Sequence, residues 1–587
     1  MSFDLKSTGK AFDLSVLRRV FALVSPYRGI FFLSVVLTIL SAVVGPAVPV
    51  VIQKAIDDPI LNNDIMGLYW YCAAVLGLLI LQAIIMYVQT YYTNWLGQKA
   101  VQHLRTGIFS HILGFRQKVY DRTPVGTMIT RTVSDVETVN EIFSQGLINI
   151  IGDTLQIAVI LGIMFYTDWQ LALVSLAVFP LLLISAYIFK EKVKVSFQDV
   201  RAQVARMNAF LQEHITGMQV VQIFNRENHE MKKFEKINEG HKDANIRSIF
   251  YYSVFFPVIE VLSAIAIALL VWWGARDILN GEQTIGTLVL FILLINLLFR
   301  PIRQIADKFN TLQMGMVASD RIFKVMDLED HIPDTGTTDK PFDGTVEFKN
   351  VWFAYNDEDW VLKDVSFKVE RGDSLAIVGH TGAGKTSITN LINRQYVYNK
   401  GAICVDDIPV EEYTLHSLRR QIAVVLQDVF LFSDTIENNI RLYNPAISNE
   451  QIIEAAHMVG AHRFIEKLPG AYKHRVQERG ANLSTGQRQL ISFIRAVIQD
   501  PAILILDEAT SSIDQETEEL IQEATDVLLK DRTSIIIAHR LSTIQHAAQI
   551  IVMEKGKIKE RGRHDELLNQ GGLYKQLYEF QFTELML

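Results

Sequence analysis

A series of long apolar runs without charged residues in the first half of the chain restricts the possible fold most strongly. A helix needs about 20 mostly apolar residues to cross the hydrocarbon core of a bilayer, and only helices or closed barrels satisfy their backbone there. Apolar runs of roughly this kind occur at six places, one of them interrupted by Glu260: 29–52, 66–97, 154–167, 169–189, 248–275 and 283–299. The sequence therefore predicts about six transmembrane helices, with a tight turn at Asp168.

The connections between these runs alternate in length and charge. Those after the first, third and fifth runs are short, whereas those after the second and fourth are long and basic. Cytoplasmic connections of membrane proteins carry an excess of Lys and Arg, so both chain ends and both long connections are expected in the cytoplasm. The long connections keep helical periodicity, with breaks at 123–126 and 215–217. This pattern predicts that the spanning helices continue from the membrane into the cytoplasm. The first run begins too late and is too long for a signal peptide, so we expect it to stay in the protein.

Glu260 lies inside one of the apolar runs. A carboxylate at membrane depth is costly and usually faces a cavity or a partner. One interpretation is a contact with the transported substrate or a proton. The other, which we favour, is a structural carboxylic acid that is hydrogen-bonded or faces water.

The sequence changes character near residue 325. We expect a transmembrane domain at 1–325, a polar linker rich in turn residues at 326–344, and a soluble domain at 345–587. The formal net charge of −8 is spread over both halves and gives no support to a nucleic-acid partner. The two cysteines, Cys72 and Cys404, fall in different halves, so the sequence predicts no disulfide framework.

The soluble half contains short β-rich runs followed by helical patterns. Strands are predicted at 345–353, 361–369, 374–378, 402–406, 502–506, 533–538 and 549–553, and helices between 435 and 497. Alternation of this kind predicts a parallel α/β core with helical insertions. The whole chain is thus expected to combine a six-span membrane helical bundle with an α/β phosphate-loop domain.

A glycine-rich motif follows the predicted strand at 374–378. It reads Gly379-His380-Thr381-Gly382-Ala383-Gly384-Lys385-Thr386 and precedes a predicted helix. Glycines let backbone N–H groups turn inward around phosphate oxygens, and a helix N-terminus adds positive potential. We expect Lys385 to reach the β- and γ-phosphates of a nucleotide and the Thr386 hydroxyl to bind Mg²⁺.

A second motif ends another buried strand in two carboxylates, Asp507 and Glu508. Open α/β sheets bind their ligands beyond the carboxyl ends of the strands. Asp507 suits the shell of a magnesium ion, and Glu508 suits a base that polarises the attacking water. Behind a phosphate loop, this pair indicates nucleotide hydrolysis.

Between these two motifs lies Asn482-Leu483-Ser484-Thr485-Gly486-Gln487-Arg488-Gln489, which by itself also reads as a helix that Ser484 caps. The order of phosphate loop, Gln427, this segment, Asp507-Glu508 and His539 resembles the ATP-binding cassette (ABC) transporters. The six-span half in front resembles their multidrug and lipid exporter branch. The resemblance covers essentially the whole chain.

The resemblance implies a role for each matching residue. Tyr355 would stack on adenine, Gln427 would sense Mg²⁺ and the attacking water, and His539 would contact the γ-phosphate. Ser484 and Gly486 match the signature that contacts the γ-phosphate on the opposite subunit, and Asp514 matches the loop that joins the two sites. The implied catalytic residues are Glu508, His539 and Gln427, and the implied Mg²⁺ ligands are Thr386, Gln427 and Asp507. The implied nucleotide-binding residues are Tyr355, Gly379, Thr381, Gly382, Ala383, Gly384, Lys385, Thr386, Ser387, Ser484, Thr485, Gly486, Gln487 and Asp514.

The sequence departs from the family pattern at three positions. Thr485 replaces the first glycine of the signature pair, Ala383 replaces a common serine, and Gln477 replaces a glycine before Glu478. None of these changes removes a catalytic functional group. The resemblance also places the coupling helices near 120–125 and 213–219, and a segment that contacts them at 478–480.

The resemblance implies an ATP- and Mg²⁺-dependent exporter of amphipathic drugs, lipids or related hydrophobic compounds across the cytoplasmic membrane. Because one chain supplies half of each nucleotide site, it would act with a second half-transporter subunit among membrane lipids. The amino-acid sequences of the signature and of 511–514 favour a heterodimer, and a homodimeric lipid exporter is the alternative. An ATP-gated channel or regulator, a soluble ATPase and a membrane anchor fit the motifs less well. The transported substrate is not readable from the sequence.

Overall fold

The computed structural model describes residues 13–142, 146–356, 359–507, 515–537 and 544–586. The chain divides into two compact units. A helical unit comprises Met1–Leu113 and Pro124–Glu329, and an α/β unit comprises Gly114–Thr123 and Asp330–Leu587.

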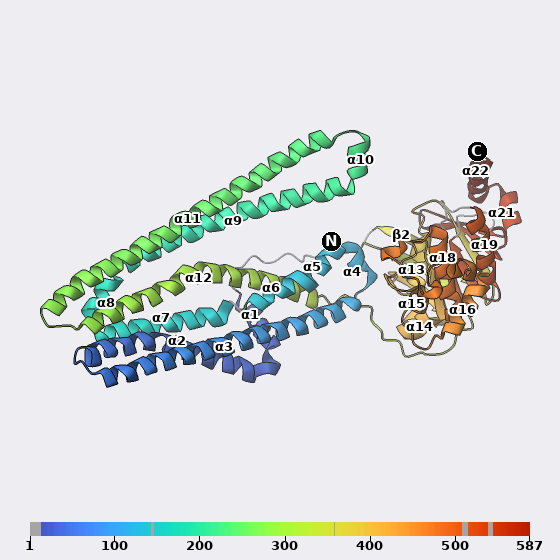
Figure 1. The fold of residues 1–587 in the computed structure, drawn as a ribbon. Helices are drawn as coiled ribbons and strands as arrows, with labels where there is room; N and C mark the ends of the chain where they lie inside the picture. The colour runs from blue at the N-terminus through green and yellow to red at the C-terminus, as the bar shows by residue number, and fades with distance from the viewer. Residues whose placement is uncertain (1–12, 143–145, 357–358, 508–514, 538–543, 587) are drawn as a thin grey trace. The chain divides into compact units, whose positions relative to one another are not determined.

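The helical unit is built from long antiparallel helices (Figure 1). Its elements are α1 (Leu14–Leu23), η1 (Ser25–Tyr27), α2 (Arg28–Ala55), η2 (Ile56–Ile60), α3 (Ile65–Leu113), α5 (Val125–Thr130), η3 (Arg131–Asp135), α6 (Val136–Glu141), α7 (Leu147–Thr167), α8 (Trp169–Leu176), α9 (Phe179–Thr216), α10 (Met218–Ile223), α11 (Glu227–Leu279) and α12 (Ile285–Met326).

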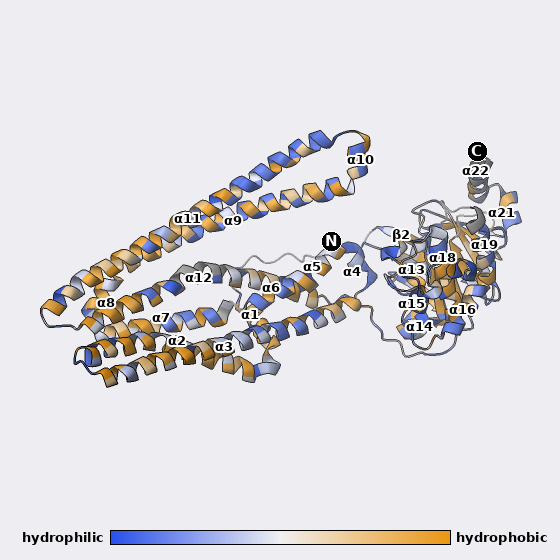
Figure 2. Cartoon of the chain, viewed as in Figure 1, coloured by the Kyte–Doolittle hydropathy of each residue, from blue (hydrophilic) through white to orange (hydrophobic). Residues whose placement is uncertain are grey.

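Among the described residues, five helical stretches are long and apolar enough to cross a membrane. A shorter apolar helix, Ile285–Pro301, is the first part of α12. These stretches coincide with the six predicted spans, and Figure 2 shows hydrophobic colour along α2 and α3. Several helices continue well beyond the apolar stretch, as the periodicity of the long connections predicts. The apolar stretch shows where lipid surrounds a helix, and the polar continuation shows where water does.

Two acidic residues of the short connections fix the ends of neighbouring helices. Asp168 accepts hydrogen bonds from the backbone N–H groups of Gln170 and Leu171 at the start of α8, at 2.8 and 3.0 Å. Asp57 accepts from the backbone N–H of Gly286 at 2.9 Å and from the Thr284 hydroxyl at 2.8 Å, at the start of α12. Carboxylates satisfy the free N–H groups of a helix N-terminus and complement its dipole. The turn predicted at Asp168 is therefore confirmed.

The fourth predicted span lies within the helical stretch Trp169–Thr216 and contains a local bend. The chain turns at residues 177–178 between α8 and α9, and Pro180 occupies the first turn of α9. Proline has no N–H to donate and suits the first turn of a helix, so it favours a new helix start here. The break predicted at 215–217 is confirmed, because α9 ends at Thr216 and Gly217 precedes α10. In Figure 1, α10 joins α9 to α11 at the tip of a long hairpin.

The α/β unit contains two sheets. The six-stranded sheet has the order β10-β9-β3-β8-β7-β6, in which β9, β3, β8, β7 and β6 run parallel and β10 pairs antiparallel with β9. Its strands are β3 (Ser374–Val378), β6 (Ile422–Val425), β7 (Ile503–Asp507), β8 (Thr533–Ile537), β9 (Gln549–Glu554) and β10 (Lys557–Gly562). The sequence predicted this parallel core but missed β6 and β10. β6 has four residues, and the burial of β10 alternates, so neither is a continuous apolar run.

The second sheet is antiparallel and contains three of the predicted strands, those at 345–353, 361–369 and 402–406, which were wrongly expected in the parallel core. Its order is β2-β1-β4-β5, with strands β1 (Val346–Ala354), β2 (Trp360–Val369), β4 (Lys400–Val405) and β5 (Ile408–Pro409). Alternating residues of β1 and β2 are buried, among them Phe348 and Phe367, whose rings stack at 4.5 Å. Helix α13 (Lys385–Ile392) packs in the same hydrophobic core as this sheet.

A helical group packs against the other side of the parallel strands. Its helices are α15 (Ile436–Arg441), α16 (Asn449–Met458), α17 (His462–Glu466), α18 (Thr485–Gln499), α19 (Gln515–Leu529), α21 (His564–Gln570) and α22 (Leu573–Met586), whereas Leu418 of α14 (Leu415–Gln421) belongs to the core around α13. Leu504 and Leu506 of β7 share a core with Leu490 and Ile494 of α18. α18 is amphipathic, and that core fixes its direction and the position of its N-terminus.

Candidate nucleotide site

The predicted phosphate loop joins β3 to α13. Gly382 and Gly384 adopt φ angles of +83° and +103°, a region that side chains disfavour. A Cβ at Gly384 would lie 2.7 Å from Leu362 Cδ2 and 3.1 Å from the Val361 carbonyl oxygen, so a side chain does not fit there. The loop can therefore turn its backbone N–H groups inward only with glycine at this position. This confirms the predicted strand–loop–helix context.

The Lys385 side chain folds back over this loop. Its ammonium donates hydrogen bonds to the carbonyl oxygens of Gly379 at 2.6 Å and His380 at 3.2 Å. Burial lowers the pKa of Lys385 below its ordinary value, and the nearby Asp507 carboxylate opposes this shift. Anionic phosphate groups would favour the charged form of this lysine in the same way.

The neighbouring residues of the loop divide into exposed and buried ones. Thr381, Gly382 and Thr386 are exposed, whereas Ala383 and Ser387 are buried. The Thr386 hydroxyl is accessible at the first turn of α13, where a ligand for Mg²⁺ was expected. Ser387 faces the opposite direction and bonds to Tyr355.

Tyr355 lies next to the phosphate-loop helix. Its hydroxyl is 3.0 Å from Ser387 Oγ, and its ring packs edge-on against Phe353 and Tyr396, with centroids 4.7 and 4.9 Å away. These contacts hold the ring at the end of β1, beside α13. An aromatic ring at this place is consistent with the predicted contact to adenine, which stays a prediction.

The parallel strands bring the other predicted residues to one edge of the sheet. The phosphate loop follows β3, Asp507 ends β7, and Gln427 follows the end of β6 by two residues. Asp507 is buried and Gln427 is exposed. Because carboxyl ends of parallel strands lie at the same edge, these groups share the crevice where α/β sheets bind ligands. Glu508, Asp514 and His539 lie outside the described residues, just after β7 and β8 in the sequence.

The groups described here suit a magnesium ion bound together with a nucleotide. Magnesium prefers oxygen ligands and is often held by one or two carboxylates together with substrate phosphates. Asp507 offers a carboxylate, Thr386 a hydroxyl and Gln427 an amide oxygen, on neighbouring elements of this edge. Within the described ranges, no cluster of three His, Cys, Asp or Glu side chains could hold a metal alone. A site completed by phosphate oxygens is what these residues fit.

The predicted signature segment forms the N-terminus of α18. Ser484 Oγ accepts a hydrogen bond from the backbone N–H of Gln487 at 3.2 Å, and the Gln487 side chain accepts from the Ser484 N–H at 3.0 Å. This reciprocal arrangement is a capping box, so the predicted cap is confirmed. Ser484 and Thr485 are exposed, whereas Gly486 is buried. The segment thus presents a hydroxyl and a helix N-terminus, both suited to an anion, at the surface of this unit.

Two arginines that sequence reasoning did not single out hold this helix in place. Arg495 donates to the carbonyl oxygens of Asn439 at 2.6 Å and Phe430 at 3.0 Å, and burial lowers its pKa to about 10. Arg488 donates to the Leu483 carbonyl oxygen at 3.0 Å and to Thr485 Oγ1 at 3.2 Å. In the sequence, an arginine that donates to backbone carbonyl groups cannot be told from any other arginine. No sequence pattern therefore identified these two residues.

A short helix from the membrane half of the sequence belongs to the α/β unit. α4 (Gln117–Arg122) overlaps the predicted first coupling segment near 120–125. Asp121 accepts a hydrogen bond from the Tyr396 hydroxyl, and Arg122 donates to the Tyr355 carbonyl oxygen at 2.8 Å and to Asn356 Oδ1 at 2.5 Å. The sequence indicated the helix but gave no sign of Tyr396 as its partner.

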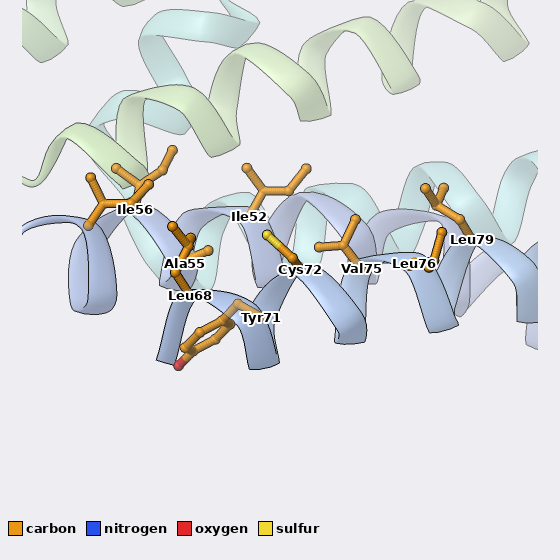
Figure 3. Close-up of a pocket in the computed structure, with 10 residues that line it drawn as sticks. Ile52, Ala55, Ile56, Leu68, Tyr71, Cys72, Val75, Leu76 and Leu79 are labelled. Atoms are coloured by element: carbon orange, nitrogen blue, oxygen red, sulfur yellow. The ribbon is translucent and has the colours of Figure 1, made fainter. Parts of the chain in front are cut away.

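A groove of about 420 Å³ lies in the helical unit between the end of α2 and the start of α3 (Figure 3). Its lining is aliphatic apart from Tyr71 and Cys72. In the close-up the Tyr71 hydroxyl points away from the other lining residues. The lining offers dispersion contacts but no charged group or general base, so this groove has no catalytic chemistry.

Comparison with known proteins agrees with this geometry. Residues 31–302 match the family model described as the ABC transporter transmembrane region, and residues 362–511 match the model described as ABC transporter. Three similar proteins are the uncharacterized ABC transporter ATP-binding protein YknV of Bacillus subtilis, a B. subtilis protein, YgaD, that carries the name of a multidrug export ATP-binding/permease protein, and an ATP-dependent lipid A-core flippase of Desulfotalea psychrophila.

These relatives match along nearly their whole length. The chain is 37% identical to YknV, with 98% of this chain and 96% of YknV covered. It is 36% identical to YgaD, with 97% and 100% covered, and 34% identical to the flippase, with 96% and 99% covered. The similarity therefore extends over both the membrane helices and the nucleotide-binding domain.

Proposed function

The chain belongs to the ABC transporter family, and from this premise we propose that it exports amphipathic drugs or lipids as one half of a dimer. It is an integral membrane protein with several apolar spanning helices, and its α/β unit binds ATP and hydrolyses it to drive transport. One observation carries the proposal: the same chain holds a complete phosphate loop, an exposed signature helix and a set of spanning helices that extend beyond the bilayer.

In the proposed site, each residue has a defined task toward ATP. The backbone of 379–384 and the Lys385 ammonium bind the phosphates, and Tyr355 stacks on adenine. Glu508 accepts a proton from the attacking water, and His539 and Gln427 orient the water and the γ-phosphate. Thr386, Asp507 and Gln427 would hold a magnesium ion, which neutralises charge on the phosphate oxygens.

The exposure of the signature supports assembly with a second subunit. Ser484 and Thr485 are accessible at the surface of the α/β unit, and a helix N-terminus with an exposed hydroxyl that can still donate suits the γ-phosphate of a nucleotide held by another chain. Asp514 would join the two sites. We favour a heterodimer because of the amino-acid sequences of the signature and of 511–514, with a homodimer as the alternative.

The tip of the α9–α11 hairpin gives a second argument for a partner. Ile223 and Phe224 are each 69% exposed at this tip, and Val220 is 59% exposed. The tip lies beyond the apolar part of both helices, so lipid does not cover these side chains. It also overlaps the segment 213–219 that the resemblance assigns to coupling, and an apolar tip suits a groove on the partner's nucleotide-binding domain.

Transport then follows from a shift between two states. ATP that contacts the phosphate loop of one chain and the signature of the other binds best when the two domains are closed, so its binding energy favours closure. Hydrolysis at Glu508 removes these contacts and restores separation. The coupling helices transmit each change to the membrane helices.

The class of cargo is inferred from the relatives and from the helices. The names of the similar proteins refer to multidrug export and to lipid A-core transport. The spanning helices of this chain are apolar and carry aromatic residues such as Tyr251, Tyr252 and Trp273. Surfaces of this kind suit amphipathic compounds.

The test is ATP hydrolysis by the chain purified alone into lipid nanodiscs, with Glu508→Gln as the control. Rapid turnover that Glu508→Gln abolishes supports a self-paired exporter. Turnover that appears only with a copurifying second chain supports the heterodimer. A folded chain that binds no ATP, with or without a partner, would refute the proposal.

A further inference from the structure

Small and polar residues lie between α2, α3 and α7 at membrane depth. The buried face of α2 consists of small residues, Ser34, Thr38, Ala42, Gly45, Pro46 and Pro49. It packs against α3 and α7, which carry glutamines at this level. Polar side chains in a bilayer are expensive and usually face the interior of the bundle, so each needs a partner or a use.

Most glutamines of these helices have partners. Gln53 donates to Thr287 Oγ1 at 3.1 Å, Gln89 donates to Thr38 Oγ1 at 2.9 Å, and Gln98 and Gln102 bond to Glu137 and Lys99. Gln82 of α3 and Gln156 of α7 are half-buried and have no hydrogen-bond partner in the described part of the chain. An unsatisfied amide in hydrocarbon costs several kcal/mol.

The two unpaired amides meet at one place. A Cβ built on Gly45 would lie 3.6 Å from Gln82 Nε2 and 4.0 Å from Gln156 Nε2. Gly45 is buried and has no side chain of its own, so space for about one methyl group remains between its backbone and the two amides. The two amides offer four N–H donors and two acceptor oxygens beside one small residue.

An ion pair lies close to these amides on the cytoplasmic side. Asp153, three residues before Gln156 on α7, bonds to Lys308 of α12. Three residues correspond to about 4.5 Å along a helix, so Asp153 and Gln156 share a face of α7. The side chains of Asp153 and Lys308 are only 25% and 18% exposed. Lys308 lies seven residues beyond the apolar part of α12, Ile285–Pro301, which places the pair near the inner boundary of the membrane.

We propose that Gln82, Gln156 and the Asp153–Lys308 pair form a subsite for the polar head of an amphiphile that carries no net charge. The pair is already neutral, so a head with one net charge would enter without a counter-ion. A zwitterionic head satisfies the ammonium and the carboxylate together and bonds to the two amides. This inference rests on the proposed export function and narrows its substrate class.

The test compares three ligands that share one tail. Hexadecylphosphocholine is zwitterionic, hexadecyl phosphate is anionic, and hexadecyltrimethylammonium is cationic. Equilibrium binding to the full chain in nanodiscs, together with any copurifying subunit, needs no ATP turnover. We expect the zwitterion to bind about tenfold more tightly than either charged compound, because only a head without net charge leaves the neutral Asp153–Lys308 pair balanced.

Four variants of the full chain identify the groups responsible. Gln82→Leu combined with Gln156→Leu should weaken binding of the two phosphate-containing ligands by about tenfold through the loss of two neutral hydrogen bonds, whereas Asn94→Leu should leave their binding unchanged. Asn94 is the matched control, because it is exposed on α3 and donates to the Thr90 carbonyl oxygen of its own helix. Lys308→Met should shift the preference to the cation and Asp153→Asn to the anion, since each leaves one charge unpaired.

The double variant Asp153→Asn with Lys308→Met guards against misfolding of the single ones. It is neutral again, so it should restore the exclusion of charged heads. Equal binding of all three ligands, or unchanged binding of hexadecylphosphocholine in the double leucine variant, would overturn the subsite. Loss of ATP hydrolysis with intact ligand preference would instead count against the proposed function alone.

Discussion

Replacing Tyr396 by phenylalanine removes one hydroxyl group from the contact between α4 and the nucleotide-binding domain. The Tyr396 side chain is 7% exposed and packs edge-on against Phe353 and Tyr355. Its hydroxyl donates to the Asp121 carboxylate of α4. Phenylalanine keeps the ring packing, so the substitution tests this single hydrogen bond.

The expected loss follows from the kind of bond. A hydrogen bond to a charged group contributes about 1.5–3 kcal/mol. That corresponds to a local opening of α4 that is about 10- to 150-fold more frequent. Arg122 still donates to the Tyr355 carbonyl oxygen and Arg116 to the His331 carbonyl oxygen, so α4 should remain docked on average.

Hydrogen–deuterium exchange of residues 117–122 in the full chain measures this opening. Tyr398→Phe is the control, because the Tyr398 hydroxyl bonds to Glu411 within the domain and not to α4. Asp121→Asn keeps an acceptor without the charge and should give a smaller effect than Tyr396→Phe. Exchange in Tyr396→Phe that equals that of the control would refute the assigned contact.

The same contact should be insensitive to pH over the physiological range. Burial, together with the hydrogen bond to Asp121, raises the pKa of Tyr396 well above its ordinary value. A group whose pKa is raised in the folded state contributes stability that is complete below the unfolded pKa, near 10 for tyrosine, and is lost above it. Exchange of α4, corrected for the intrinsic rate, should therefore not change between about pH 7 and 9.

Three further predictions concern single residues. Gly384→Ala should weaken binding of a fluorescent ATP analogue by about tenfold or more, because a Cβ there meets Leu362 and the left-handed φ is strained. Ser484→Ala should lower the thermal stability of the full chain by about 1 kcal/mol through loss of the cap, whereas Ser484→Asp should keep stability but lose ATP hydrolysis. Asp57→Ala should destabilise the start of α12 by about 1 kcal/mol in a thermal unfolding assay, and Asp58→Ala, which removes no bond to α12, should not.

The sequence predicted the elements that follow from the length of an apolar run, from turn residues or from a motif. Apolar length located the spans, because a bilayer demands it, and the turn residues Asp168 and Gly217 lie where the helices end. The phosphate loop was predictable from its glycines. The break before Pro180 was missed because the apolar run continues through it, so composition alone gave no signal.

The features that the sequence did not predict depend on contacts between distant residues. β6 has only four residues, and the strands of the antiparallel sheet are buried alternately. Their place in a sheet therefore depends on the strands with which they pair. Tyr396 lies 275 positions from Asp121, and neither residue type is unusual in its surroundings. Gln82 and Gln156 likewise become notable only because Gly45 brings them together. Such residues acquire meaning from the fold.

The division of the chain into two units explains how the nucleotide site can act on the membrane helices. The α/β unit includes Gly114–Thr123, which lies between α3 and α5 in the sequence. The chain therefore passes from one unit to the other three times, after Leu113, after Thr123 and after Glu329. Because α4 is hydrogen-bonded beside Tyr355, the proposed contact of that tyrosine with adenine would act through α4 on the adjoining ends of α3 and α5. Three covalent connections can transmit both a displacement and a rotation of the α/β unit to the helical unit. A single linker after α12 would transmit mainly a displacement along the linker.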